Sequence, residues 1–540
     1  MHLRLQLPPS SGSGLSRSPS PSSSGRSRLL RHPVRQPVRR LLLGLGLLLL
    51  LAALITRIAC TEQALSDGSN TILEGWDFAH GNVLLHGWIL SDVSFYALEI
   101  PVAALSVLAV GASAMAVHLT AGLVFTLVIG CTLWCDRGPV TRWVLALAVL
   151  LVPLSDAIAQ HALIVGVDHL GSSVFILLST LVVDRLRGRW FAPWLLLLVL
   201  TLGEVSDEFV AYVGVPAVVG VCFWEMASER RLSWDVVDLL RLAAAATVSV
   251  TVARHVRSVL RHLGAYAMTA PNTVVSPRSE WLGHLSSTWF GLRVLLGFAQ
   301  PGGGIAGVRE FVLGWMLLAL VVLGAIRTLC HWRTSPTAQR ISVLLVPGAL
   351  AAYTLSEQSA KAGNAFDLAG AMPFCALLAA NALPGRWSVR CGLRRAAVGM
   401  VGAVTALAVL FAAAQPAGTA DSSMLIARLR ALHLSYGISD YPTASSTTVQ
   451  SDLRVTVRAV VWNGAGFDVY GWETRTPWYD AAKHDARFFV TSASGGGTPP
   501  TEVVAAFGRP EAQYRVGHDE VLVYSYNLLT RIRAAARPTG

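Results

Sequence analysis

The chain has 540 residues, of which 53% are hydrophobic and only 14% are charged. Its repeated apolar runs are longer than the helices of a soluble core usually are, which excludes a soluble globular protein as the main interpretation. The formal net charge of +11 comes mostly from arginines in the N-terminal tail and between apolar runs, and the sequence has no basic stripe with interleaved aromatic residues. Membrane lipids are therefore expected partners, and nucleic acid is not.

The N-terminal residues 1–38 are rich in serine, proline and arginine, and are too polar to bury a core. We expect a disordered, basic cytoplasmic tail. The apolar stretch 41–56 that follows is similar to the core of a signal peptide, with Ala59 and Cys60 where a lipoprotein cleavage site would lie. Arg57 stands where that signal needs an apolar residue, so we prefer a retained first membrane span.

Residues 39–413 are predicted to form a transmembrane domain of about 11 helices. After the first span, apolar segments lie at about 113–134, 141–158, 170–186, 191–204, 209–226, 238–253, 309–329, 341–356, 365–383 and 393–413. Arginines mark the connecting segments 136–142, 184–189, 229–241, 327–340 and 386–395. The positive-inside rule puts these segments in the cytoplasm, so the N-terminus is expected inside and the C-terminal region outside a plasma membrane.

The extracytoplasmic loop 60–112 contains no lysine or arginine, although Glu74, Asp77, Asp92 and Glu99 lie in it. Apolar residues at helical spacing predict an amphipathic helix that ends near Gly81 and lies along the membrane surface. A second short helix is expected to begin near Glu99. An acidic loop without bases beside a membrane is itself a candidate site.

Other carboxylates also gather on the predicted external side. The second external loop, 156–169, carries Asp156, Asp168 and His169 without any basic Lys or Arg, and the turn at 204–208 adds further acids. Charged groups at the membrane boundary usually face a cavity or a partner. For any one of these groups, the alternative to a role in a site is that it only lies in solvent at the end of a helix.

Residues 414–540 have a different sequence pattern from the predicted transmembrane domain. They are predicted to form a small extracytoplasmic α/β domain. We expect a helix at 421–437 that ends at Gly437, and a second helix that ends near Gly508. Alternating or β-branched runs at 453–461, 488–493 and 520–529 predict strands.

This arrangement resembles the GT-C class of integral-membrane glycosyltransferases, which combine many spans, a large acidic first external loop and a soluble external C-terminal domain. The stretches GNVLLHGWILSDVSFYALEIP, VDHLG and ISDYPTASSTTVQSD, with TPWYD, AAFGRP and VLVYSYNLLTRI, resemble actinobacterial membrane proteins of that kind. The resemblance covers about residues 40 to 530. It implies transfer of a sugar from a polyprenyl-phosphate donor to a cell-envelope glycan or lipid acceptor outside the membrane.

The resemblance also implies roles for individual residues. In this class a first-loop carboxylate acts as general base, which makes Asp77 the first candidate for catalysis and Glu99 the second. Asp156, Asp168 and His169 would contribute to substrate binding.

The leaving phosphate also needs a positive partner. Members with a FEKPP-like stretch have a lysine directly after the glutamate, whereas here Ile100 follows Glu99. Lys361, in the external turn 357–367, is the candidate that replaces it, and Arg254, Arg257 and Arg278 are others. Some members use a divalent cation, but the sequence assigns no metal ligands.

Two further functions stay open at this point. A transporter or flippase would use the charges Glu204, Asp207 and Glu208 beside glycine- and proline-broken spans. A non-catalytic envelope-assembly protein would bind glycan through aromatic side chains of the C-terminal region. The aromatic candidates for that role are Trp462, Trp472, Trp478 and Tyr479.

Overall fold

The computed structural model describes residues 35–165, 169–228, 234–269, 275–298, 304–360, 364–383, 391–418, 422–492 and 497–533. The chain divides into two units, residues 1–47 and 48–540. The described part of the first unit is a helical segment from Arg35, so residues 35–38 are helical, whereas we expected them to belong to a disordered tail. The rest of that predicted tail, residues 1–34, lies outside the described residues.

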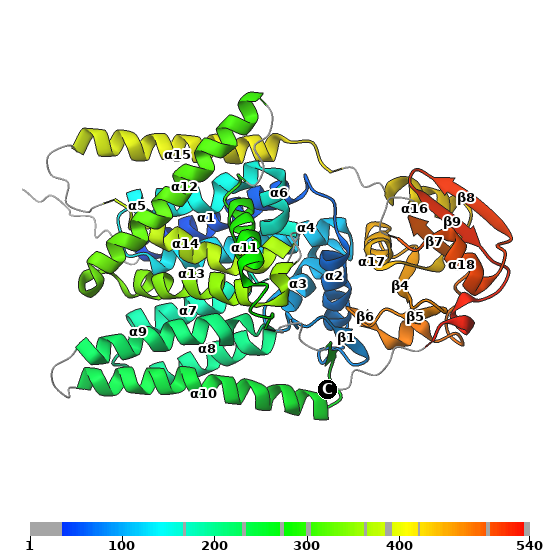
Figure 1. Ribbon diagram of the computed structural model, residues 1–540, viewed down its shortest axis with the longest axis horizontal. Coiled ribbons are helices and arrows are strands. Elements are labelled where there is room, and N and C mark those ends of the chain that lie inside the picture. Colours follow the sequence, from blue (N-terminus) through cyan, green and yellow to red (C-terminus); the bar gives the residue numbers. More distant parts are fainter. Residues whose placement is uncertain are drawn as a thin grey trace, which may run out of the picture. The chain divides into compact units, whose positions relative to one another are not determined.

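Helices make up most of residues 35–414 (Figure 1). The helices of this region are α1 (Arg35–Ala59), α2 (Ser66–Ala79), α3 (Glu99–Val110), α4 (Ala114–Cys135), α5 (Val140–Leu151), α6 (Ala157–Gln160), α7 (Ser172–Arg185), α8 (Ala192–Ser206), α9 (Val215–Ser228), α10 (Trp234–His262), α11 (Trp281–Leu295), α12 (Gly304–Cys330), α13 (Thr337–Leu355), α14 (Met372–Ala380) and α15 (Cys391–Ala414). Short 3-10 and π turns connect several of them. Among these are η2 (His161–Val165), η5 (Glu357–Ala360) and η6 (Asn364–Ala371).

Within the described residues, 6 helical segments are long and apolar enough to cross a membrane, or 7 if a pair bent by 109° at residues 155–157 counts as one span. The chain is therefore a multi-pass membrane protein. Each of the predicted spans coincides with helix, but several of these helices are short. Ala192–Ser206 has 15 residues, for example, whereas a perpendicular span needs about 20. The number of about 11 spans stays a prediction.

Three of the five predicted arginine-bearing connections are joined by ion pairs. Arg137, which follows α4, pairs with Asp184 at the end of α7 at 2.9 Å. Arg187, from the same connection as Asp184, and Arg340, from segment 327–340, both pair with Glu225 of α9. These segments therefore share one end of the helical region, and the side of the membrane on which this end lies stays a prediction.

Helix α2 forms where the amphipathic pattern predicts it and ends one residue before His80. Most of its residues are buried, because it packs against α3 on one side and against α17 (Tyr441–Gln450) of the C-terminal region on another. Gly75 permits the close approach of α3, since a Cβ at this position would lie 2.7 Å from the Cβ of Ala103. The expectation that this helix lies along a membrane surface is therefore wrong: protein encloses it.

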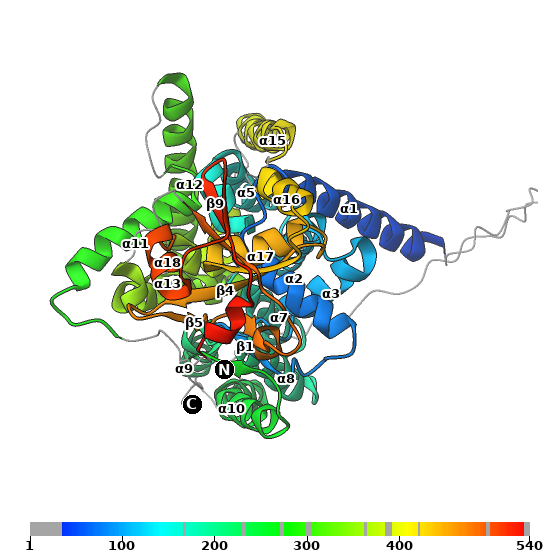
Figure 2. The same cartoon turned by 90° about the vertical axis from the view of Figure 1, so that its right-hand side faces the viewer.

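The C-terminal region is a 6-stranded sheet with helices on both faces (Figure 2). Its strand order is β5-β4-β3-β7-β9-β8. The strands are β3 (Tyr436–Ser439), β4 (Thr456–Trp462), β5 (Phe467–Val469), β7 (Phe488–Ser492), β8 (Ala512–Val516) and β9 (Asp519–Val523). Strand β3 pairs parallel with β4 and with β7, and the other pairs are antiparallel.

Alternate residues of the strands pack on opposite faces of this sheet. Phe489 joins Val503 and Phe507 of α18 (Pro500–Phe507) in one core. Phe488 and Leu425 belong to the opposite core, beneath α17 and α16 (Ser422–Ala431). The C-terminal region thus combines strands and helices, and β4, β7, β9 and α18 lie where the sequence predicts them. Its status as a separate domain stays a prediction.

One predicted boundary in this domain is wrong. We expected a helix that ends at Gly437, but α16 ends at Ala431 and Gly437 lies inside strand β3. A Cβ at Gly437 would collide with the ring of Phe488 on the neighbouring strand. The glycine therefore serves close packing between strands rather than a helix stop.

A second, smaller sheet joins three distant parts of the chain. Strand β1 (Trp88–Leu90) of the first loop pairs parallel with β2 (Ala267–Met268), which follows α10. It also pairs antiparallel with β6 (Thr474–Arg475) of the C-terminal region. The first loop is therefore hydrogen-bonded to both the helical region and the C-terminal domain.

Candidate functional site

A cavity of about 410 Å³ opens where the loops predicted to be external converge. The residues that line it are Asp67, Ser91, Asp92, Val93, Phe95, His169, Asp207, Glu208, Phe209, Tyr212, Val213, Ala349, Ala352, Tyr353, Ser356, Gln358, Phe366, Asp367, Tyr470, Trp472 and Glu473. They come from the first loop, the loop before α7, the ends of α8 and α13, and the C-terminal region. None of these described residues is a lysine or an arginine.

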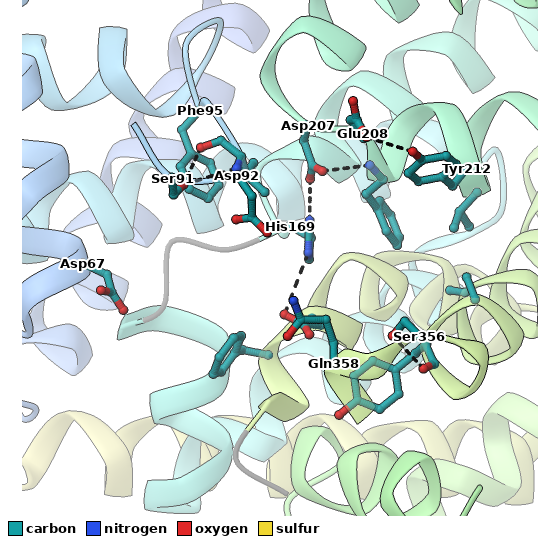
Figure 3. Close-up of a pocket in the computed structure, with 18 of the residues that line it drawn as sticks. Asp67, Ser91, Asp92, Phe95, His169, Asp207, Glu208, Tyr212, Ser356 and Gln358 are labelled. Atoms are coloured by element: carbon teal, nitrogen blue, oxygen red, sulfur yellow. Dashed lines mark hydrogen bonds and ion pairs between the residues drawn. The ribbon is translucent and has the colours of Figure 1, made fainter. Parts of the chain in front are cut away.

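Asp207, directly after α8, is the hub of the site (Figure 3). Its Oδ2 accepts hydrogen bonds from Nδ1 of His169 at 2.6 Å and from the hydroxyl of Ser172 at 2.5 Å. Its Oδ1 accepts one from the backbone N–H of Phe209 at 2.8 Å. Burial by itself raises the pKa of Asp207, but the neighbouring His169 and these hydrogen bonds outweigh it and hold the pKa below its usual range. The carboxylate is therefore ionised.

His169 presents its other ring nitrogen to the cavity. Because Asp207 accepts from Nδ1, that nitrogen carries the proton in the neutral ring and Nε2 is the acceptor. Nε2 lies 3.9 Å from Oδ1 of Asp367, across the cavity. The ring also stacks on Phe209, with centroids 5.3 Å apart. Gly370 leaves room for both, since a Cβ there would lie 2.9 Å from the His169 carbonyl oxygen and from the Phe209 ring.

The first loop is hydrogen-bonded to the C-terminal end of α8. The backbone N–H groups of Ser94 and Phe95 donate to the carbonyl of Ser206, and the N–H of Ala97 donates to its hydroxyl at 2.7 Å. These bonds hold Asp92 in the same cavity wall as Asp207.

At the edge of the site, Arg257 of α10 pairs with Glu208 at 2.7 Å. Glu208 itself lines the cavity and also accepts a hydrogen bond from Tyr212. This ion pair brings a guanidinium group beside a cavity whose described lining has no such group of its own.

The C-terminal region supplies the remaining wall. Tyr441 places its hydroxyl 2.5 Å from both Oδ1 of Asp67 and Oε2 of Glu473. Asn70 also donates to Glu473, at 3.2 Å. One phenol proton cannot serve two carboxylates, so one of the two acids must carry a proton of its own.

Burial raises the pKa of Glu473 well above its usual range, and the nearby charges of Asp67 and Glu74 raise it further. Burial raises the pKa of Asp67 and of Glu74 as well. Where α2 meets the C-terminal domain, burial therefore favours the protonated form of these acids.

Asp77, the first candidate for the catalytic base, lies outside this cavity. Its carboxylate accepts from the indole N–H of Trp88 at 2.7 Å and from Asn82 at 2.9 Å, and it pairs with Arg475 at 3.1 Å. Trp88 and Arg475 are themselves neighbours across the β1–β6 pair. Asp77 therefore acts as a clamp between the first loop and the C-terminal domain, and its catalytic role stays a prediction.

The other predicted site residues do not all lie at the cavity. Glu99 is fully buried at the start of α3, packed against Gly171, and does not line the cavity. Asp156 caps α6 by accepting from the N–H of Ala159 at 2.8 Å. Among the described members of the predicted set, only His169 lines the cavity. Asp168 and Lys361 are not among the described residues.

Sequence reasoning missed Asp67 and Glu473, and it assigned Asp207 to transport rather than to this site. The first two are separated by most of the chain, and no local pattern reports a contact between them. The acidity of loop 60–112 was the one available signal for Asp67. Within the described residues, no group of three or more His, Cys, Asp or Glu side chains has an arrangement that could hold a metal ion.

Comparison with known proteins gives a distant structural likeness. No family model matches the chain, and no curated protein matches it. Among solved structures, it is similar to the crystal structure of ArnT from Cupriavidus metallidurans bound to undecaprenyl phosphate, with 12% sequence identity and a TM-score of 0.46. The likeness covers 90% of this chain and 98% of that chain.

Proposed function

We propose that this protein is a membrane glycosyltransferase that moves a sugar from a polyprenyl-phosphate carrier to a hydroxyl of a cell-envelope acceptor on the outer side of the membrane. The observation that carries the proposal is the Asp207–His169 pair, which faces an acid-lined cavity at one end of apolar helices. The sequence resemblance to GT-C glycosyltransferases supports the same reaction class.

The pair has the arrangement of a general base and the group that orients it. Nε2 of His169 removes the proton of the acceptor hydroxyl as its oxygen attacks the anomeric carbon of the donor sugar. The bond from that carbon to the phosphate oxygen breaks, and the carrier leaves as polyprenyl phosphate. Asp207, held ionised by Ser172 and Phe209, stabilises the imidazolium that forms.

The leaving phosphate requires positive charge near the same cavity. Arg257 is the described residue that fits this need, because its ion pair with Glu208 holds it beside the lining. Its guanidinium can bind two phosphate oxygens at once. Lys361 stays a second candidate from the sequence. Within the described residues, no group of three or more His, Cys, Asp or Glu side chains could hold a divalent cation, so the proposal assigns no step to one.

The proposal is tested by replacing His169 in the native host. In a deletion strain complemented with His169→Ala, we expect loss of the same envelope glycan that the deletion loses, because the acceptor hydroxyl has no base. His161→Ala is the matched control, since His161 lies in the same loop but does not line the cavity. Both variants are checked for membrane level and thermal stability.

A normal glycan profile with stable His169→Ala protein would contradict the proposal. Proteoliposomes provide the second test. The purified wild-type protein should release polyprenyl phosphate only when an acceptor is present, because the bond to the sugar breaks during transfer. Movement of the intact lipid-linked sugar across the bilayer without acceptor would instead favour a flippase.

A further inference from the structure

Segment 470–473 brings an aromatic surface from the C-terminal domain into the cavity. Tyr470, Trp472 and Glu473 line it together with His169 and Asp207. Trp472 is half-buried, and among the described residues its ring contacts no other aromatic ring.

The other tryptophans of this region are different. Trp462 packs on Phe467, with ring centroids 5.2 Å apart. Trp478 meets Trp88 edge to face at 4.9 Å and carries the guanidinium of Arg458 on its ring. Both are therefore engaged in internal contacts, whereas Trp472 lines the cavity and, among the described residues, stacks on no other aromatic ring.

Two sets of contacts hold this segment in place. On its C-terminal side, β6 pairs with β1, and Asp77 bonds to Arg475 and Trp88 across that pair. On its N-terminal side, the ring of Tyr470 packs against that of Tyr441 with centroids 4.8 Å apart.

Glu473 has a left-handed backbone with a φ of 45°, a conformation that is unfavourable for a residue with a Cβ. Such strain persists where surrounding contacts enforce it, and it clusters at functional sites. Here Asn70 and Tyr441 hold the carboxyl group of Glu473 by hydrogen bonds.

The chemistry of this wall selects a class of ligand. An indole face binds the C–H face of a sugar ring, and carboxyl groups exchange hydrogen bonds with its hydroxyls. The acids in the lining are Asp67, Asp92, Asp207, Glu208, Asp367 and Glu473. Because all six of these side chains are acidic, this wall disfavours an additional anionic group on the acceptor.

We propose that segment 470–473 is the acceptor subsite: Trp472 stacks on a neutral, unphosphorylated sugar ring, and Glu473 forms a hydrogen bond with one of its hydroxyls. This inference rests on the glycosyltransferase function proposed above. It makes the C-terminal domain a part of the site that selects the acceptor.

Saturation-transfer NMR on the full-length protein in nanodiscs measures sugar binding at the subsite and does not depend on the transfer reaction. The probes are methyl mannoside, methyl glucoside and methyl arabinoside, with mannose 6-phosphate as the anionic comparison. We expect saturation transfer to at least one neutral glycoside and a weaker signal for the phosphate. Trp472→Ala should weaken binding about 10-fold, Trp472→Phe should restore most of it, and Trp190→Ala, at an exposed distant tryptophan, should leave it unchanged.

Equal glycoside binding by Trp472→Ala and wild-type protein, or stronger binding of the phosphate, would overturn the subsite. His169→Ala separates the two proposals, since it should keep glycoside binding while it abolishes transfer. If His169→Ala loses the glycan but Trp472→Ala binds normally, the subsite fails alone. If Trp472-dependent binding persists in a protein without transferase activity, the proposed function fails and sugar recognition remains.

Discussion

Asp207 determines which nitrogen of His169 is available for chemistry. Its carboxylate is 2% exposed and accepts three hydrogen bonds, so it is a fixed negative charge beside the imidazole. A histidine oriented in this way can take a proton at Nε2 without first changing its tautomer.

We predict that Asp207→Asn lowers the rate of transfer by about 100-fold to 10,000-fold, in the range of a lost general-base arrangement. The amide has no charge to stabilise an imidazolium, and its NH₂ group can force the ring into the wrong tautomer. The rate is measured as glycan transferred per amount of folded protein in membranes. A rate within a factor of about three of wild type would show that His169 does not act through Asp207.

Some residues of the site can be predicted from local sequence patterns, whereas others depend on contacts between distant parts of the chain. His169 lies in a short loop without bases beside a predicted span, and that local pattern is visible in a single sequence. Asn70 and Glu473 meet over a separation of 403 residues. Such a contact depends on how the first loop docks on the C-terminal domain, which periodicity and composition do not encode.

At the scale of elements, the first loop is a connector as much as a lining segment. Helix α2 packs between α3 and α17, and strand β1 pairs on both sides. The helical spacing from Ile72 to Gly81 was enough to predict α2. The surface on which α2 packs was not predictable, because an apolar helix face suits protein and lipid equally well.

Asp77 allows the connector role to be separated from a catalytic one. We predict that Asp77→Asn lowers the free energy of unfolding by about 1.5 to 3 kcal/mol, as expected for hydrogen bonds to a charged group. Thermal unfolding of purified Asp77→Asn, Arg475→Gln and the double variant forms a double-mutant cycle. Because both variants break the same ion pair, their effects should not add.

A catalytic Asp77 would give another result. The activity of Asp77→Asn would then be lost at wild-type stability, and the Arg475→Gln variant would keep its activity. That result would support Asp77 as the general base, which is the role that the sequence resemblance implied.

The α2–α3 contact gives a second prediction at this scale. We expect Gly75→Ala to lower stability by about 1 to 3 kcal/mol, because the new methyl group would lie 2.7 Å from the Cβ of Ala103 and force the helices apart. Gly348→Ala is the matched control, since a Cβ there meets nothing within 4 Å and helix propensity favours alanine. Thermal unfolding in one detergent compares the two. Equal stability of both variants would contradict the close packing.

For the whole molecule, the buried acids between α2 and the C-terminal domain couple folding to pH. Burial raises the pKa of Glu473 well above its usual range, so the folded protein holds a proton there that the unfolded chain releases above about pH 4. Between that pH and the raised pKa, the folded state binds more protons than the unfolded state, and stability falls as the pH rises.

We therefore predict that the protein is more stable at pH 5.5 than at pH 8, measured by thermal unfolding of the full chain. Glu473→Gln should flatten this dependence, because the amide cannot release a proton. Glu511→Gln, at an exposed position of the same domain, should leave the slope as it is. An unchanged slope in Glu473→Gln would show that this acid is not the coupling group.

Strand β1 places a constraint on how this protein can be re-engineered or can diverge. It forms one small sheet with β2 and β6, so three regions far apart in the chain share a single set of backbone hydrogen bonds. Grafting the C-terminal region of a related protein onto this membrane region would therefore leave an unmatched sheet edge, unless the graft also carried its own first loop. Exchange of specificity between such proteins should require both segments to move together.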